Sequence, residues 1–112
     1  SDCSPLISYE DVFSCETLSS SVIEKVKSES HTRLYLSAMN ILKTLESNLK
    51  NDYNISENNI NRFIEFLKLY PVDLMVGIMK DIKSNYINIY SKAIENEEFV
   101  ELYFESYSMI RG

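Results

Sequence analysis

The apolar residues of this chain recur at the spacing of α-helices, most densely in the stretch from Tyr70 to Lys83. Here they follow the i, i+3, i+4, i+7 pattern of one helical face, at Val72, Met75, Val76, Met79 and Ile82. Leu74 and Ile78 widen this face, and Val76 lies at its centre. Because apolar side chains surround so much of the circumference, we expect a central helix near residues 72–83, wrapped by the other helices.

Five further segments show helical periodicity, and a short helical turn is expected near Val12. The apolar sets are Val22, Ile23 and Val26; Leu34, Ala38, Ile41, Leu42, Leu45 and Leu49; Ile60, Phe63, Ile64 and Leu67; Tyr86, Ile87, Tyr90, Ala93 and Ile94; and the run from Phe99 to Ile110. Ile89 falls outside its pattern, so we expect it to be exposed. The chain is predicted to fold as an all-α, single compact bundle of five to six helices.

Polar residues and proline indicate where these helices begin and end. Capping-box spacings start at Ser8 and at Ser21, which predicts helix starts there. Residues 28–32 contain no apolar side chain and are interpreted as a turn. Pro71 disfavours helical geometry at the preceding residue, so the helix before it should end near Leu69.

Composition supports a helical domain and divides the chain into two parts. In 112 residues there are only two glycines and two prolines, too few for the many turns of a β-sandwich. We expect residues 1–20 to be an acidic lead-in with one short helical turn and residues 21–112 to be the helical domain. A start at Ser1 and an end at Gly112 are compatible with a fragment of a longer chain.

The net charge of −6 argues against nucleic acid as a partner, because phosphate binding needs a basic patch. The acids are concentrated at the ends: residues 1–20 carry four acids and no base, and residues 93–112 carry five acids and one base. With neither an apolar run long enough to span a bilayer nor a signal-peptide pattern, we expect a soluble protein without membrane insertion, in the cytoplasm or nucleus. Cys3 and Cys15 are expected to be reduced, the alternative being a disulfide in a secreted protein.

Candidate catalytic chemistry is sparse. The single histidine, His31, lies in the predicted polar turn, and we interpret it as a solvated residue rather than a general base. No His/Cys cluster has metal-ligand spacing, and two glycines cannot form a phosphate-binding loop, so we expect no metal, no cofactor and no enzymatic activity. Gly77 interrupts the most apolar helix, which predicts close approach of another helix or, alternatively, a notch that admits a ligand.

The last helix carries the candidate site. Asn96 is a good N-cap, and the aromatic and apolar residues that follow are too many for one core-facing stripe. An acidic, aromatic surface of this kind is typical of a protein interface, and the candidate partner-binding residues are Glu97, Glu98, Glu101, Tyr103, Glu105 and Tyr107. The alternative is a terminal helix packed into a groove, with its tyrosine hydroxyls reaching solvent.

We therefore expect a non-catalytic protein–protein interaction domain of the adaptor type. It would bind a basic or helical partner, or a peptide, through the C-terminal helix or the adjacent groove. The first alternative is a structural role through homo-oligomerisation, with the same surface forming a homodimer. A small-molecule carrier or an enzyme is the second alternative and ranks third among the expected functions.

Overall fold

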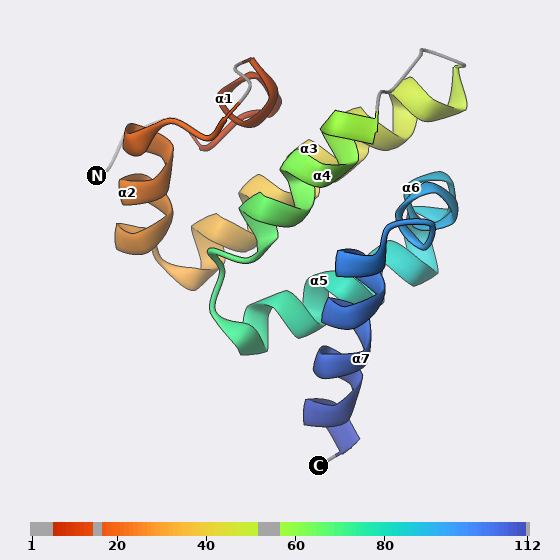
Figure 1. The fold of residues 1–112 in the computed structure, drawn as a ribbon. Coiled ribbons are helices and arrows are strands. Elements are labelled where there is room, and N and C mark those ends of the chain that lie inside the picture. Colours follow the sequence, from red (N-terminus) through yellow and green to blue (C-terminus); the bar gives the residue numbers. More distant parts are fainter. Residues whose placement is uncertain (1–5, 15–16, 52–56, 112) are drawn as a thin grey trace.

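A computed structural model describes residues 6–14, 17–51 and 57–111 of the chain, and these residues form α-helices and no strand. The seven helices are α1 (Tyr9–Phe13), α2 (Ser20–Ser28), α3 (His31–Lys50), α4 (Glu57–Leu67), α5 (Val72–Asn85), α6 (Ile87–Ala93) and α7 (Glu97–Arg111). Figure 1 shows α1 and α2 on one side of the long helix α3 and α5 to α7 on the other. The predicted all-α bundle is confirmed. Cys3 and Cys15 lie outside the described residues.

Serine side chains cap the first three helices. At α1, the Ser8 hydroxyl accepts the backbone N–H of Asp11 while the Asp11 carboxylate accepts that of Ser8, so the predicted capping box is confirmed. The cap of α2 is Ser19, not the predicted Ser21, because the hydroxyl two residues upstream reaches the N–H of Val22. Among three consecutive serines, spacing alone did not select the cap.

The polar segment between α2 and α3 is shorter than the predicted turn. Only Glu29 and Ser30 lie outside the helices, because Ser30 caps α3 directly through the N–H of Arg33. His31 is therefore the first residue of α3 rather than a turn residue. It is exposed, as expected, and its Nδ1 lies 4.0 Å from a carboxylate oxygen of Asp73.

The core is built chiefly from α3, α4 and α5. The stripe predicted from Leu34 to Leu49 is buried except for Leu49, which is half-buried, and the face predicted for α4 is buried. α4 ends at Leu67, two residues before the predicted end, and continues in a tight turn in which Leu69 and Tyr70 bond to carbonyl groups three residues back. In this turn the buried Tyr70 hydroxyl donates to the carbonyl oxygen of Leu34 at 2.8 Å.

α5 contacts α3, α6 and α7, in agreement with its predicted central place. Its buried stripe is Met75, Ile78, Met79 and Ile82, so the helix is rotated relative to the prediction. Val72 is 44 % exposed, and Val76 is half-buried instead of lying at the centre of the face. Val76 lines a pocket together with residues of α7, and Val72 lies four residues before it on the same side of α5. The Tyr35 hydroxyl on α3 donates a hydrogen bond to the Asp81 carboxylate at 2.6 Å, which links α3 to the polar side of α5.

Two expectations for single residues were wrong. A Cβ atom added to Gly77 would meet no atom within 4 Å, so close approach of another helix does not explain this glycine. Ile89, expected to be exposed, is fully buried, whereas Ile87 is 58 % exposed. The Glu46 carboxylate on α3 accepts the backbone N–H groups of Asn88 and Ile89, and these bonds fix the direction in which α6 faces.

In the described part of the chain, each helix is too short or too polar to cross a lipid bilayer.

Candidate functional site

α7 is fixed to the body over its first turns. The Asn96 side-chain oxygen accepts the backbone N–H of Phe99 at 3.2 Å, so the predicted N-cap is confirmed. Phe99 is fully buried, with its ring 6.4 Å from that of Tyr90 on α6. Tyr90 also lies 6.2 Å from Tyr103, one turn further along α7. Beyond this point Figure 1 shows the last turns of α7 extending past α5.

The outer side of α7 carries an aromatic strip, formed by Val100, Phe104 and Tyr107. Phe104 is 63 % exposed and Tyr107 is 48 % exposed, while Val100 is half-buried. Residues four and seven positions apart share one helical face, so the three side chains are neighbours. Tyr107 was among the predicted site residues. Phe104 was not, although up to residue 108 it has the highest exposure among the large apolar side chains of the described residues.

Tyr103, another of the predicted site residues, lies between the strip and the body of the protein. It is half-buried against Phe99 and Phe104, with ring centroids 6.4 and 6.5 Å apart. The ammonium group of Lys83 lies 5.7 Å from the centre of its ring. A side-chain hydrogen bond with Tyr103 raises the pKa of Lys83 above its usual value. Tyr103 therefore links α7 to α5 through Lys83 and packs against Phe104 of the strip.

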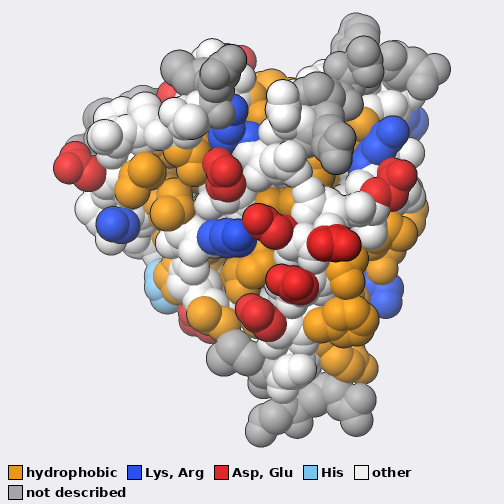
Figure 2. Space-filling view, viewed as in Figure 1, with side chains coloured by type: hydrophobic (Ala, Val, Ile, Leu, Met, Phe, Trp, Pro, Cys, Tyr) orange, Lys and Arg blue, Asp and Glu red, His pale blue; other side chains and the backbone are white. Residues whose placement is uncertain are grey.

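An acidic row, formed by Glu97, Glu101 and Glu105, runs along α7 beside the aromatic strip. All three side chains are exposed, and the spacing of four residues places them one turn apart on one face. Figure 2 shows carboxylates gathered next to hydrophobic side chains where α7 crosses the visible face. Glu98 has a different partner, because its carboxylate lies 2.7 Å from the ammonium group of Lys68 at the end of α4. Of the predicted acids, the structure therefore places three in a row and ties the fourth to the body.

A small pocket lies between α5 and α7, next to the strip. It has a volume of about 90 Å³ and is lined by Val76, Met79, Lys80, Tyr103, Ser106 and Tyr107. Ser106 is only 2 % exposed, and its hydroxyl has no hydrogen-bond partner among the described residues. Sequence reasoning missed this residue, because one serine within an aromatic helix carries no signal of its own. Val76, half-buried on α5, forms part of the wall of this pocket.

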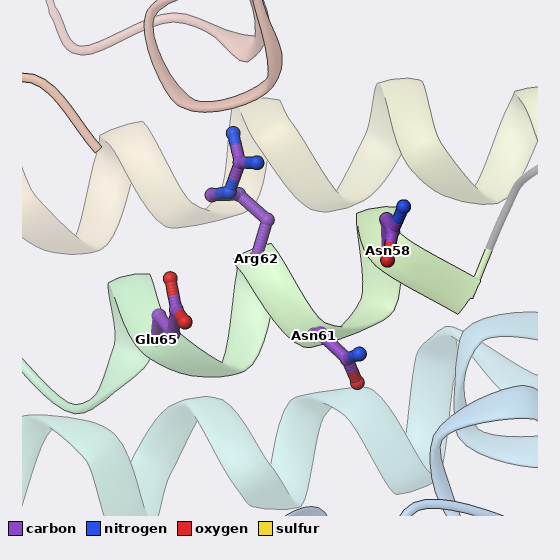
Figure 3. A pocket seen from close by; sticks show the side chains of 4 residues that line it. All are labelled: Asn58, Asn61, Arg62 and Glu65. Carbon is purple, nitrogen blue, oxygen red and sulfur yellow. The ribbon is translucent and has the colours of Figure 1, made fainter. Parts of the chain in front are cut away.

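Two wider, polar grooves lie beside α4. Asn58, Asn61, Arg62 and Glu65 line the first, which has a volume of about 380 Å³ and is drawn in Figure 3. Arg62 points toward the α1 region and donates to the carbonyl oxygen of Val12 at 3.2 Å, so this guanidinium holds the fold together. The second groove, of about 540 Å³, shares Asn61 and Glu65 and reaches Glu97 and Glu98.

The described residues include histidine, aspartate and glutamate side chains, which are potential metal ligands. Within residues 6–14, 17–51 and 57–111, no three histidine, cysteine, aspartate or glutamate side chains are placed to hold a metal ion. α7 presents exposed aromatic area and a line of carboxylates, and a small pocket adjoins them. No family model, curated protein or solved structure matches this chain.

Proposed function

We propose that this chain is a non-catalytic protein-interaction domain that binds a basic, amphipathic partner helix through the aromatic strip and the acidic row of α7. The exposure of Phe104, 63 % on a helix firmly anchored by Phe99, is the observation that carries the proposal. Aromatic side chains are enriched in protein interfaces and supply much of their binding energy.

The charges beside the strip favour one kind of partner. Glu97, Glu101 and Glu105 repeat every fourth residue and are exposed, so lysine or arginine side chains at the same spacing on a second helix would face them. A partner helix that places apolar residues at i, i+3 or i+4 and i+7 covers the strip, while its basic flank covers the acidic row. An acidic partner would meet repulsion along the same line.

The chain offers a matched pair of variants for the test. Phe104→Asp places a charge in the strip, and Ile87→Asp makes the same change on α6 at a side chain of similar exposure, 58 %. In affinity capture from the source cells, we expect one set of proteins to bind the wild type and the Ile87→Asp variant but not the Phe104→Asp variant. Equal capture by all three proteins would contradict the proposal.

The acidic row has a separate test. The double variant Glu101→Lys, Glu105→Lys should slow association with a captured partner and reduce its salt dependence, because exposed charges act mainly on the encounter rate. Glu24→Lys on α2 is the control, since Glu24 is also exposed and lies on a different helix. An unchanged association rate in the double variant would remove the acidic row from the binding surface.

Self-association through the same strip makes a different prediction. Light scattering over a wide concentration range should give a constant, monomeric mass if the partner is another protein. A mass that rises with concentration in the wild type but not in Phe104→Asp would overturn the proposal and assign the strip to a homodimer.

A further inference from the structure

Two lysines of α5, Lys80 and Lys83, lie beside the aromatic strip and are called the lysine edge below. The ammonium group of Lys83 is 5.7 Å from the ring centre of Tyr103, and Lys80 lines the small pocket together with Tyr107. Both lysines are exposed, and neither forms an ion pair with a carboxylate of the described residues. The lysine edge therefore offers two positive charges to an acidic group of another molecule.

The strip lies between the lysine edge and the acidic row. Successive residues of an α-helix advance by about 100° around its axis, clockwise when the helix is viewed from its first residue. In this view α7 presents Tyr103 first, then Tyr107 and Phe104, and then the acidic row. α5 contacts the Tyr103 side of α7 with the lysine edge, and the acids lie on the other side. A helix laid along the strip therefore has one flank over carboxylates and the other over ammonium groups.

We infer that the partner helix carries acidic side chains on the flank that faces Lys80 and Lys83, opposite the basic flank that faces the acidic row. The inference rests on the proposed function, since the strip is what brings a helix to the lysine edge. A helix with basic side chains on both flanks would meet repulsion from the two lysines, so the lysine edge selects against it.

The two charged edges also determine the direction in which a partner helix lies. In a heptad abcdefg with apolar residues at a and d, positions e and g lie on opposite flanks of the apolar stripe. Because α-helices are right-handed, glutamate at e and lysine at g match the two edges only when the partner runs parallel to α7. Lysine at e and glutamate at g match them only when the partner runs antiparallel. Exchanging the two charges should therefore reverse the direction of the bound helix.

Synthetic helices test the charge selection. The probes are two-heptad peptides with leucine at a and d, held helical by a hydrocarbon staple on the outer face. One peptide has glutamate at e and lysine at g, the second has these charges exchanged, and the third has lysine at both positions. Fluorescence anisotropy gives the affinity of each peptide for the wild type and for the double variant Lys80→Glu, Lys83→Glu. The control of the same net charge is Lys27→Glu, Lys43→Glu, which reverses exposed lysines of α2 and α3.

Reversal of the lysine edge should shift the preference toward the all-lysine peptide. Relative to the control, the ratio of its affinity to that of either oppositely charged peptide should rise by about 3- to 10-fold, the effect of a few exposed ion pairs. Both variants have the same net charge, so the long-range attraction of basic peptides cancels in this comparison. An unchanged ratio would overturn the inference. Absence of binding by the two oppositely charged peptides, or an affinity that Phe104→Asp does not reduce, would overturn it as well.

A nitroxide label at the N-terminus of the bound peptide reports its direction. With glutamate at e, the label should broaden the NMR signals of amides near Glu97 more than those near Ser108, and the exchanged peptide should give the opposite result. Broadening at the same end by both peptides would contradict the inference. If the proteins captured from the source cells bind the wild type and the Lys80→Glu, Lys83→Glu variant equally, but not Phe104→Asp, the role of the lysine edge is overturned and the proposed function stands.

Discussion

The carboxylate of Glu46, near the end of α3, accepts the backbone N–H of Ile89 at 3.0 Å, although the two residues are 43 positions apart. The same carboxylate accepts the backbone and side-chain N–H groups of Asn88, at 3.1 and 2.7 Å. Tyr86 caps α6 without a side-chain bond of its own, so Glu46 takes over that role from another helix. This contact turns Ile89 inward and leaves Ile87 in solvent.

Replacement of Glu46 should destabilise the fold. Glu46→Ala removes an ionised acceptor from three N–H donors, and for this partly exposed side chain we expect a loss of about 1–3 kcal/mol in the free energy of unfolding. Urea denaturation measures the change. Glu24→Ala, at an exposed position on α2, is the control and should stay within about 0.5 kcal/mol of the wild type. Equal stability of the two variants would mean that α6 does not depend on Glu46.

The observed buried face of α5 predicts which of its apolar residues contributes most to stability. Ile78 is fully buried, and Ile78→Ala should cost about 2–5 kcal/mol through lost transfer energy and a cavity. Val76 is half-buried beside the pocket, so Val76→Ala should cost less than about 1.5 kcal/mol. Urea midpoints of the two variants give the order. A larger effect at Val76 would restore the face predicted from sequence.

Gly77 should be replaceable without loss of stability. The space around it is open, so Gly77→Ala introduces no clash and removes the conformational cost of glycine within a helix. We expect the free energy of unfolding to rise by about 0.5–1 kcal/mol. A decrease in thermal or urea stability would show that something approaches this residue closely after all.

Two buried serines should respond in opposite ways. The Ser37 hydroxyl accepts the backbone N–H of Ile7 at 3.1 Å, so Ser37→Ala leaves a buried donor unpaired and should cost about 1–3 kcal/mol. Ser106, equally buried, makes no such bond, and Ser106→Ala should be neutral or stabilising by up to about 1 kcal/mol. Urea denaturation of both variants checks this. A costly Ser106→Ala would mean that the hydroxyl is already satisfied in the isolated protein.

Tyr70 is expected to lower the free energy of unfolding at alkaline pH. Burial raises its pKa above the ordinary value near 10, because an ionised phenol is disfavoured in the core. Above about pH 10 the unfolded chain loses this proton while the folded chain keeps it, so the free energy of unfolding decreases as pH rises. Tyr70→Phe should have a shallower decrease above pH 10, at a cost of about 1 kcal/mol at neutral pH for the lost bond to Leu34. Parallel pH profiles for both proteins would contradict this assignment.

Periodicity predicted the helices and the buried face of α4, because the apolar residues of α4 occupy a single stripe, Ile60, Phe63, Ile64 and Leu67. It failed where apolar residues surround the helix. In α5 both Val76 and Ile78 fit an apolar face, and only packing against neighbours decides which turns inward. The direction in which α6 faces depends on Glu46, which lies on another helix, so no pattern within α6 itself predicts it.

The candidate site was predictable to a similar degree. Glu97, Glu101 and Glu105 were expected at the surface and lie there. Tyr103 and Phe104 are adjacent aromatic residues, and the contact of Tyr103 with Tyr90, 13 positions away, buries the first and leaves the second exposed. The Ser106 pocket depends on the crossing of α5 and α7, which no local pattern encodes.

The dependence of α6 on Glu46 also has a kinetic consequence. A helix of seven residues has little stability by itself, so α6 should assemble only after α3 has formed and should be among the first elements to open. α7 packs on α5 and also contacts α6 through the ring of Tyr90, so such an opening would remove one of the contacts that hold the start of α7. Amide hydrogen exchange should therefore show similar, low protection for α6 and the start of α7, well below that of α3. A partner bound to the strip would slow exchange in both helices together.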